Sequence, residues 1–158
     1  MDEKAKKHTL RLIPYGLYVL TVRTEEGVAA ATVSWLTQAS FKPPRIVVGL
    51  RRETTIWQAV RETGVFAVNV LGSEQKALAS TFFRHVKPGE DPLHGTPVHE
   101  GVTGAPILKD VPAYLECRVV EPLDAGDHTL FLAEVVEAGV HDDRDALKLP
   151  DTGWHYGG

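Results

Sequence analysis

Apolar and β-branched residues alternate with polar ones in two pairs of runs, one near each end of the chain. The first pair covers residues 15–24 and 28–37, and a Glu-Glu-Gly turn separates its members. The second pair covers residues 113–123 and 128–140, which a short polar turn also joins. Each pair predicts an antiparallel hairpin, because two strands connected by so few residues can pair directly only in that sense.

The region between the hairpins predicts two further strands and a helix. Short apolar runs at residues 45–50 and 65–71 are typical of buried strands. A helix is expected between them, from Thr54 or Thr55 to about Thr63, since threonine is a good N-cap and the glycine that follows can end the helix.

A second helix is expected after Ser73, which would cap it, with Leu78 and Phe82 stacked one turn apart. Residues 84–109 are rich in proline and glycine without periodicity and predict a long loop, of a length more often functional than accidental. The end of the chain predicts a short strand at residues 147–149 and an aromatic tail.

The order of these elements predicts a mainly β fold. Strands that come in adjacent pairs, with two helices inserted, favour an antiparallel barrel over a doubly wound parallel sheet. A length of 158 residues, with no internal repeat, predicts one domain over residues 1–158 that can bury a core without a disulfide or a structural metal.

Composition narrows the class of function. The single cysteine, Cys117, alternates with Leu115 and Val119 and is therefore expected in the core, which together with the lack of a signal segment predicts a cytoplasmic protein. No apolar run is long enough to span a membrane, and a net charge of −4 argues against nucleic-acid binding.

The usual catalytic motifs are missing from the sequence. It contains no Gly-x-Gly-x-x-Gly, no P-loop, no zinc pattern among its seven histidines and no Gly-x-Ser-x-Gly elbow. We therefore predict no catalytic side chain and no metal site, and expect a cofactor that brings its own chemistry.

One segment carries a family resemblance. Residues Ala30–Leu50, AATVSWLTQASFKPPRIVVGL, resemble the signature of the flavin reductase-like and flavoredoxin-like FMN-binding split-barrel family. Further matches follow in the same order, namely FAVNVL at 66–71, LEC at 115–117 and GDHTLF at 126–131. The resemblance implies a Greek-key, antiparallel split β-barrel that binds FMN and forms a homodimer.

The expected flavin site combines this resemblance with the chemistry of the residues. Small side chains before Thr32 let the backbone approach a flat ring, and Trp35 could cover one face of it. Arg51 and the two threonines at a helix N-terminus suit a phosphate. The candidate cofactor-binding residues are Ala31, Thr32, Val33, Ser34, Trp35, Leu36, Ala39, Ser40, Arg51, Thr54, Thr55 and His128.

Several roles within this site stay open. Thr54 can be a helix cap only, and the sequence does not decide which threonine hydroxyl meets the phosphate. His128 either faces the flavin or the nicotinamide, or is a solvated turn residue. Trp154, His155 and Tyr156 either reach a flavin, in the same or the partner subunit, or pack at the tail.

The resemblance implies an NAD(P)H-dependent flavin reductase that passes electrons to free flavin or to another acceptor. An alternative is a flavoredoxin-like electron carrier that a protein partner reduces. A third alternative, a barrel for a small ligand other than flavin, predicts a colourless protein.

Overall fold

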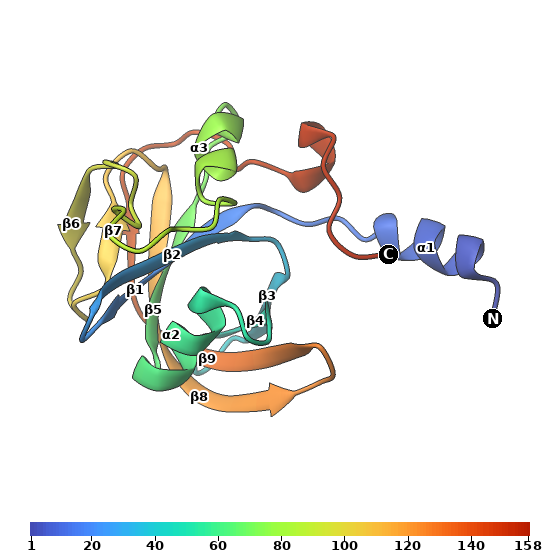
Figure 1. The fold of residues 1–158 in the computed structure, drawn as a ribbon, viewed down its shortest axis with the longest axis horizontal. Coiled ribbons are helices and arrows are strands. Elements are labelled where there is room, and N and C mark those ends of the chain that lie inside the picture. The colour runs from blue at the N-terminus through green and yellow to red at the C-terminus, as the bar shows by residue number, and fades with distance from the viewer.

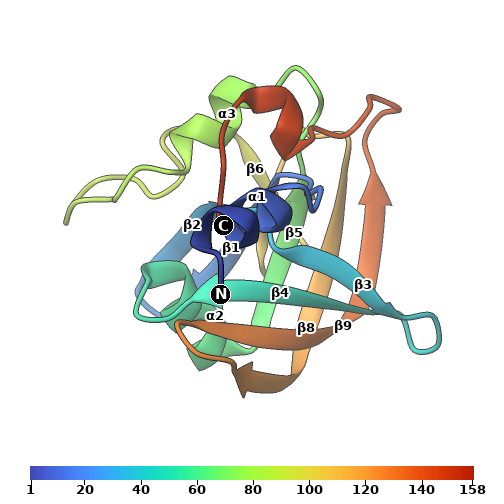
Figure 2. The same ribbon diagram turned by 90° about the vertical axis from the view of Figure 1, so that its right-hand side faces the viewer.

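Seven antiparallel strands form the main sheet of the computed structural model, which describes residues 1–158. Their order across the sheet is β2-β1-β5-β8-β9-β4-β3, and Figure 2 shows how they curl around a common interior. The strands are β1 (Tyr18–Thr24), β2 (Gly27–Val33), β3 (Leu36–Ser40), β4 (Arg45–Arg51), β5 (Val65–Val70), β8 (Ala113–Asp124) and β9 (His128–Val140).

The two edge strands of this sheet, β2 and β3, are consecutive in the chain. Only Ser34 and Trp35 separate them, so the two edges come together at that point. The sheet is thereby closed into a barrel whose gap lies between β2 and β3. The expected single strand over residues 28–37 is wrong, because the chain leaves β2 after Val33 in order to pair with β4.

Helix α2 (Thr55–Thr63) packs on the barrel as the sequence predicts. The Thr54 side chain accepts a hydrogen bond from the backbone N–H of Trp57, and Gly64 ends the helix in the left-handed conformation, with φ 66°. The apolar face of α2 packs into a core of 14 buried residues, to which the helix contributes Ile56, Ala59 and Val60. The sheet contributes Phe66 and Phe131 to the same core.

The remaining helices are short or peripheral. Helix α3 spans Lys76–Thr81, and its first turn has no side-chain cap, so the prediction that Ser73 caps it is wrong. The side chain of the preceding Gln75 instead accepts a hydrogen bond from the Gly72 N–H. Helix α1 (Glu3–Arg11), which the sequence analysis did not predict, has no buried residue and extends away from the barrel (Figure 1).

Two other predictions need correction. The region 84–109 is not loop throughout, since β6 (Val98–Glu100) and β7 (Pro106–Leu108) pair in a small second sheet. Residues 147–149 do not form a strand: Lys148 makes one isolated bridge with Gly16, and a 3-10 helix, η1 (Leu149–Thr152), follows. The tail beyond η1 then runs back to lie beside α1 (Figure 1).

Candidate functional site

A cavity of about 1190 Å³ opens between β2, the start of α2, the segment after α3 and the C-terminal tail. This volume exceeds the range of about 300–1,000 Å³ that is usual for small-molecule sites, so a whole nucleotide can enter. Eight of the twelve predicted residues line the cavity, namely Ala31, Thr32, Val33, Ser34, Trp35, Arg51, Thr54 and Thr55.

The other four predicted residues lie outside the lining. Leu36, Ala39 and Ser40 belong to β3, which leaves the cavity to pair with β4. His128 starts β9 and packs behind Trp35, with 4.5 Å between the two ring centroids.

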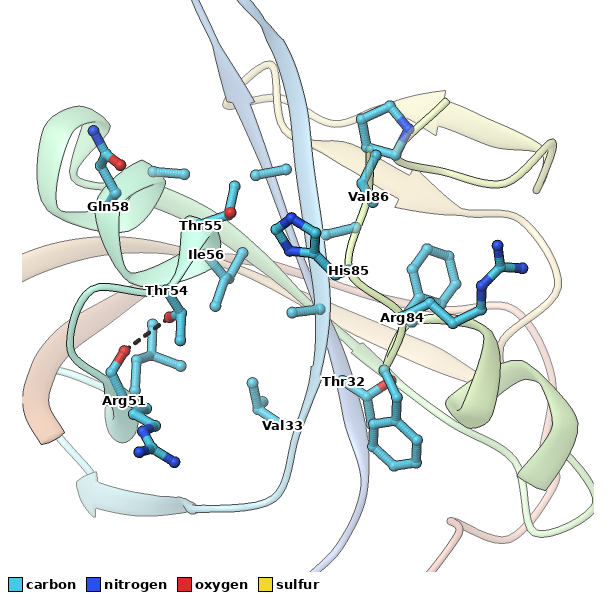
Figure 3. A pocket seen from close by; sticks show the side chains of 18 of the residues that line it. Thr32, Val33, Arg51, Thr54, Thr55, Ile56, Gln58, Arg84, His85 and Val86 are labelled. Carbon is cyan, nitrogen blue, oxygen red and sulfur yellow. Dashed lines mark hydrogen bonds between the residues drawn. The ribbon is translucent and has the colours of Figure 1, made fainter. Parts of the chain in front are cut away.

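One end of the cavity is polar and holds Arg51, Thr54 and Thr55 (Figure 3). The Thr54 hydroxyl donates to the Arg51 carbonyl oxygen at 2.8 Å and accepts from the Trp57 N–H at 3.3 Å. The Thr55 hydroxyl and the Arg51 guanidinium make no hydrogen bond within the protein, and the first N–H groups of α2 have no helical partner. This corner can therefore hold an anion, and Thr55 offers the free hydroxyl.

Aromatic side chains line another part of the cavity. Trp35 meets the ring of Tyr156 edge-on, with centroids 4.9 Å apart, and its indole N–H is buried without a hydrogen-bond partner. Gly49 lies under Trp35, where an added Cβ would come within 3.4 Å of the indole. An unpaired buried donor beside a cavity suits the carbonyl oxygen of a ligand.

His128 is held from both sides of its ring. Its Nδ1 lies 2.7 Å from the Asp127 carboxylate and its Nε2 lies 2.5 Å from the Tyr156 hydroxyl. The hydrogen bond from His128 lowers the pKa of Asp127. Only 12% of the His128 side chain is exposed, so it is not a solvated turn residue.

The sequence analysis missed part of the lining. Residues 82–90 cross the cavity opposite α2 and bring Arg84, His85 and Lys87 to it (Figure 3). Trp154, His155 and Tyr156, whose role the sequence left open, also line the cavity. The only sequence signals were the length of the 84–109 segment and the basic residues at its start.

Residues 10–156 match the family described as "Flavin reductase like domain". The chain belongs to this family. The flavin reductase-like domain thus takes in the whole cavity, and most of α1 lies outside the match.

Relatives agree with this family over most of the chain. The reductase component of a 4-nitrophenol 4-monooxygenase/4-nitrocatechol 2-monooxygenase of Rhodococcus opacus is 37% identical over 138 residues, which are 87% of this chain and 72% of the relative. The NADH:FAD oxidoreductase SgcE6 of Streptomyces globisporus has the same fold, with a TM-score of 0.84 and 28% identity over 93% of this chain and 88% of that protein.

Other relatives are much longer proteins. Diflavin flavoprotein A 1 of Synechocystis is 32% identical over 126 residues, and this chain spans only 22% of its length. The match therefore concerns one part of that protein.

The comparisons confirm the resemblance inferred from the sequence, the mainly β split-barrel fold and the prediction of an oxidoreductase of the flavin reductase type. None of the helices combines the length and the apolar character needed to cross a bilayer.

Proposed function

We propose that this flavin reductase-like protein holds FMN with its phosphate at Arg51 and Thr55 and its ring system between β2 and Trp35, and uses NAD(P)H to reduce it. Residues 1–158 form a single domain in this proposal. The observation that carries it is the presence of a free anion corner and an unpaired indole N–H in one cavity.

The residues fit the chemical groups of FMN. The Arg51 guanidinium, the Thr55 hydroxyl and the start of α2 suit the charge of a phosphate. Ala29, Ala30 and Ala31 leave room for a flat ring along β2, and the Trp35 N–H can donate to a ring carbonyl oxygen. The Thr54 hydroxyl is already engaged as the cap of α2, so Thr55 is the hydroxyl that we assign to the phosphate.

The bound flavin would accept a hydride, which requires no acid or base from the protein. The work of this chain is to position the ring, to hold the phosphate and to limit the access of water. Residues 82–90 and the aromatic tail cover the cavity and so can limit the access of water to it.

The relative from Rhodococcus is named as the reductase component of a monooxygenase. By analogy, we propose that this protein supplies reduced flavin to a separate oxygenase, and that it works as a homodimer in the cytoplasm. The electron carrier stays the alternative, since the diflavin relatives contain the same domain within a longer chain.

An anaerobic visible absorbance spectrum tests this proposal, recorded on the FMN-loaded protein before and after NADH and then NADPH. Bleaching of the flavin bands by either nucleotide supports the reductase and identifies its donor. A spectrum that stays yellow favours the carrier, and failure to retain FMN at all contradicts both.

A further inference from the structure

The corner formed by Trp35 and His128 is filled by the tail of the chain itself. The phenol ring of Tyr156 meets Trp35 edge-on at 4.9 Å and lies 5.7 Å from the His128 ring, again edge-on. The Tyr156 hydroxyl is hydrogen bonded to His128 Nε2. A six-membered aromatic ring with one polar substituent thus occupies a ready-made aromatic subsite at the edge of the cavity.

The hydrogen bonding in this corner has a direction. Because His128 Nδ1 faces the Asp127 carboxylate at 2.7 Å, the neutral imidazole carries its proton on Nδ1 and presents a lone pair at Nε2. The Tyr156 hydroxyl donates to that lone pair. Nicotinamide is also a six-membered aromatic ring, and the N–H₂ group of its carboxamide is a donor that could replace the hydroxyl.

The tail is attached in a way that allows it to leave. Residues 153–158 make no backbone–backbone hydrogen bond with the rest of the protein, and only the Trp154 N–H donates to the hydroxyl of the nearby Thr152. The tail is held instead by side chains: Trp154 packs edge-on against Phe83 at 4.9 Å, and Tyr156 reaches His128. Gly153, with φ 79°, precedes both side chains and gives the chain a turn at the root of the tail.

The fit of the tail on Trp35 also depends on Gly157. An added Cβ at this position would come within 2.8 Å of the indole, and the backbone has φ 88° there. Any larger residue would therefore lift the tail from Trp35. The contact is close enough to exclude a second ring from the same place.

We propose that Tyr156 is an internal competitor for the nicotinamide ring, and that the tail 154–158 must swing off Trp35 and His128 before NAD(P)H can bind in the productive position. The inference rests on the proposed function for the identity of the second substrate. Tyr156 then sets the apparent affinity for the dinucleotide, because only the fraction of molecules with an open tail can bind it.

Calorimetric titration of the FMN-loaded protein with NAD⁺, which binds without turnover, tests the competition. Tyr156→Ala should bind NAD⁺ about 10-fold more tightly than the wild type, since both the ring contact and the hydrogen bond of the closed tail are lost. Tyr156→Phe, which loses only the hydrogen bond, should gain about 3-fold. Gly157→Ala keeps Tyr156 and should change the affinity in the same direction.

The matched control is Phe41→Ala, which removes an aromatic ring that is 92% exposed in the turn between β3 and β4 and should leave the NAD⁺ affinity as it is. Unchanged or weaker NAD⁺ binding in all three tail variants would overturn the proposal and make Tyr156 a wall of the site. The absence of any NAD⁺ binding, in the wild type and the variants alike, would overturn it as well.

A second measurement separates this inference from the assignment of FMN. In the flavin-free protein, 1-methylnicotinamide should shift the backbone amide NMR signals of residues 154–158 and of Trp35. If FMN fails to bind but these signals move, the proposed function is wrong and the subsite stands. If FMN binds and the tail signals do not respond, the tail does not compete.

Discussion

The two sides of the barrel differ in how they treat buried polar groups. On the side covered by β6 and β7, opposite α1 and the tail (Figure 1), the buried side chains of Glu116 and Asn69 have their partners. Glu116 is fully buried, and its carboxylate accepts hydrogen bonds from the Val102 N–H, the Thr103 N–H and the Thr103 hydroxyl. Asn69 bonds to the Val19 carbonyl and to the Leu108 N–H.

On the cavity side, three polar groups are left free, of which the indole N–H is buried and the other two side chains are exposed. The Trp35 indole N–H, the Thr55 hydroxyl and the Arg51 guanidinium all lack partners within the protein. A buried donor without a partner costs free energy, so the Trp35 indole N–H is the group on this side that most calls for a ligand. Paired buried groups thus secure the fold on one side, and the free groups on the other side are the ones that we propose to meet the ligand.

Removing the Glu116 carboxylate should have the largest effect. Glu116→Ala leaves two backbone N–H groups without an acceptor and should lower the free energy of unfolding by about 3 kcal/mol, measured by urea denaturation. FMN affinity should change little in the protein that remains folded. Glu121→Ala, an exposed position on the same strand β8, is the control. Equal losses from both variants would show that Glu116 is not the anchor of this side.

For Arg51, on the cavity side, we expect a loss of FMN affinity and little loss of stability. Arg51→Ala should weaken FMN binding by about 1.5–3 kcal/mol, through loss of a charge-assisted bond, with little change in stability. Fluorescence titration with FMN measures the effect. Riboflavin, which lacks the phosphate, should bind both proteins alike. Arg52→Ala removes the neighbouring cation outside the cavity, and if it weakens FMN binding as much as Arg51→Ala, the phosphate corner is misplaced.

Thr54 and Thr55 are adjacent threonines to which we assign different roles, the first in stability and the second in FMN binding. Thr54→Ala removes the cap of α2 and should lower the free energy of unfolding by about 1 kcal/mol. Thr55→Ala should instead weaken FMN binding by about 1.5 kcal/mol and leave the stability nearly unchanged. Thermal unfolding and FMN titration of both variants check this, and an exchange of the two effects would reverse the assignment.

The smallest expected effect is on the stability of the protein at acidic pH. Arg144 bonds to Asp142, Glu74 and Asp110, and its hydrogen bond lowers the pKa of Asp142 in the folded state. A lowered folded-state pKa stabilises the protein above the ordinary pKa of about 4 and ceases to do so as the pH falls through the folded value. The stability advantage of the wild type over Arg144→Ala should therefore shrink below about pH 4. A constant difference in urea midpoints across that range would contradict this account.

The sequence predicted the parts of the fold that local patterns determine. Alternation identified both hairpins, and a threonine cap with a following glycine identified α2. Helix α1 was missed because no apolar stripe marks it, and its cap, Asp2, stands in a charged segment. The strands β6 and β7 were missed because three residues each are too few to show a period.

For the candidate site, too, the sequence predicted only those parts that local patterns determine. Arg51 and Thr55 could be found because a helix start attracts anions whatever the fold around it. The sequence could not tell Thr55 from Thr54, since either can cap a helix; the hydrogen bonds show that Thr54 is the cap, and the assignment of Thr55 to the phosphate stays a proposal. Residues 82–90 and the tail reach the cavity from distant parts of the chain, and no local sequence pattern predicts that they lie together there. The single-domain, homodimer and cytoplasmic assignments stay predictions.

The burial of Cys117 bears on how well the protein resists oxidation during turnover. A reductase that releases reduced flavin in air also generates hydrogen peroxide, which attacks thiolates far faster than thiols. Cys117 is the only cysteine, is fully buried in β8, and has its pKa raised to about 12 by burial and by the neighbouring Glu116 charge. We therefore expect the protein to present almost no thiolate to the oxidant and to resist sulfenic acid formation and cross-linking between molecules.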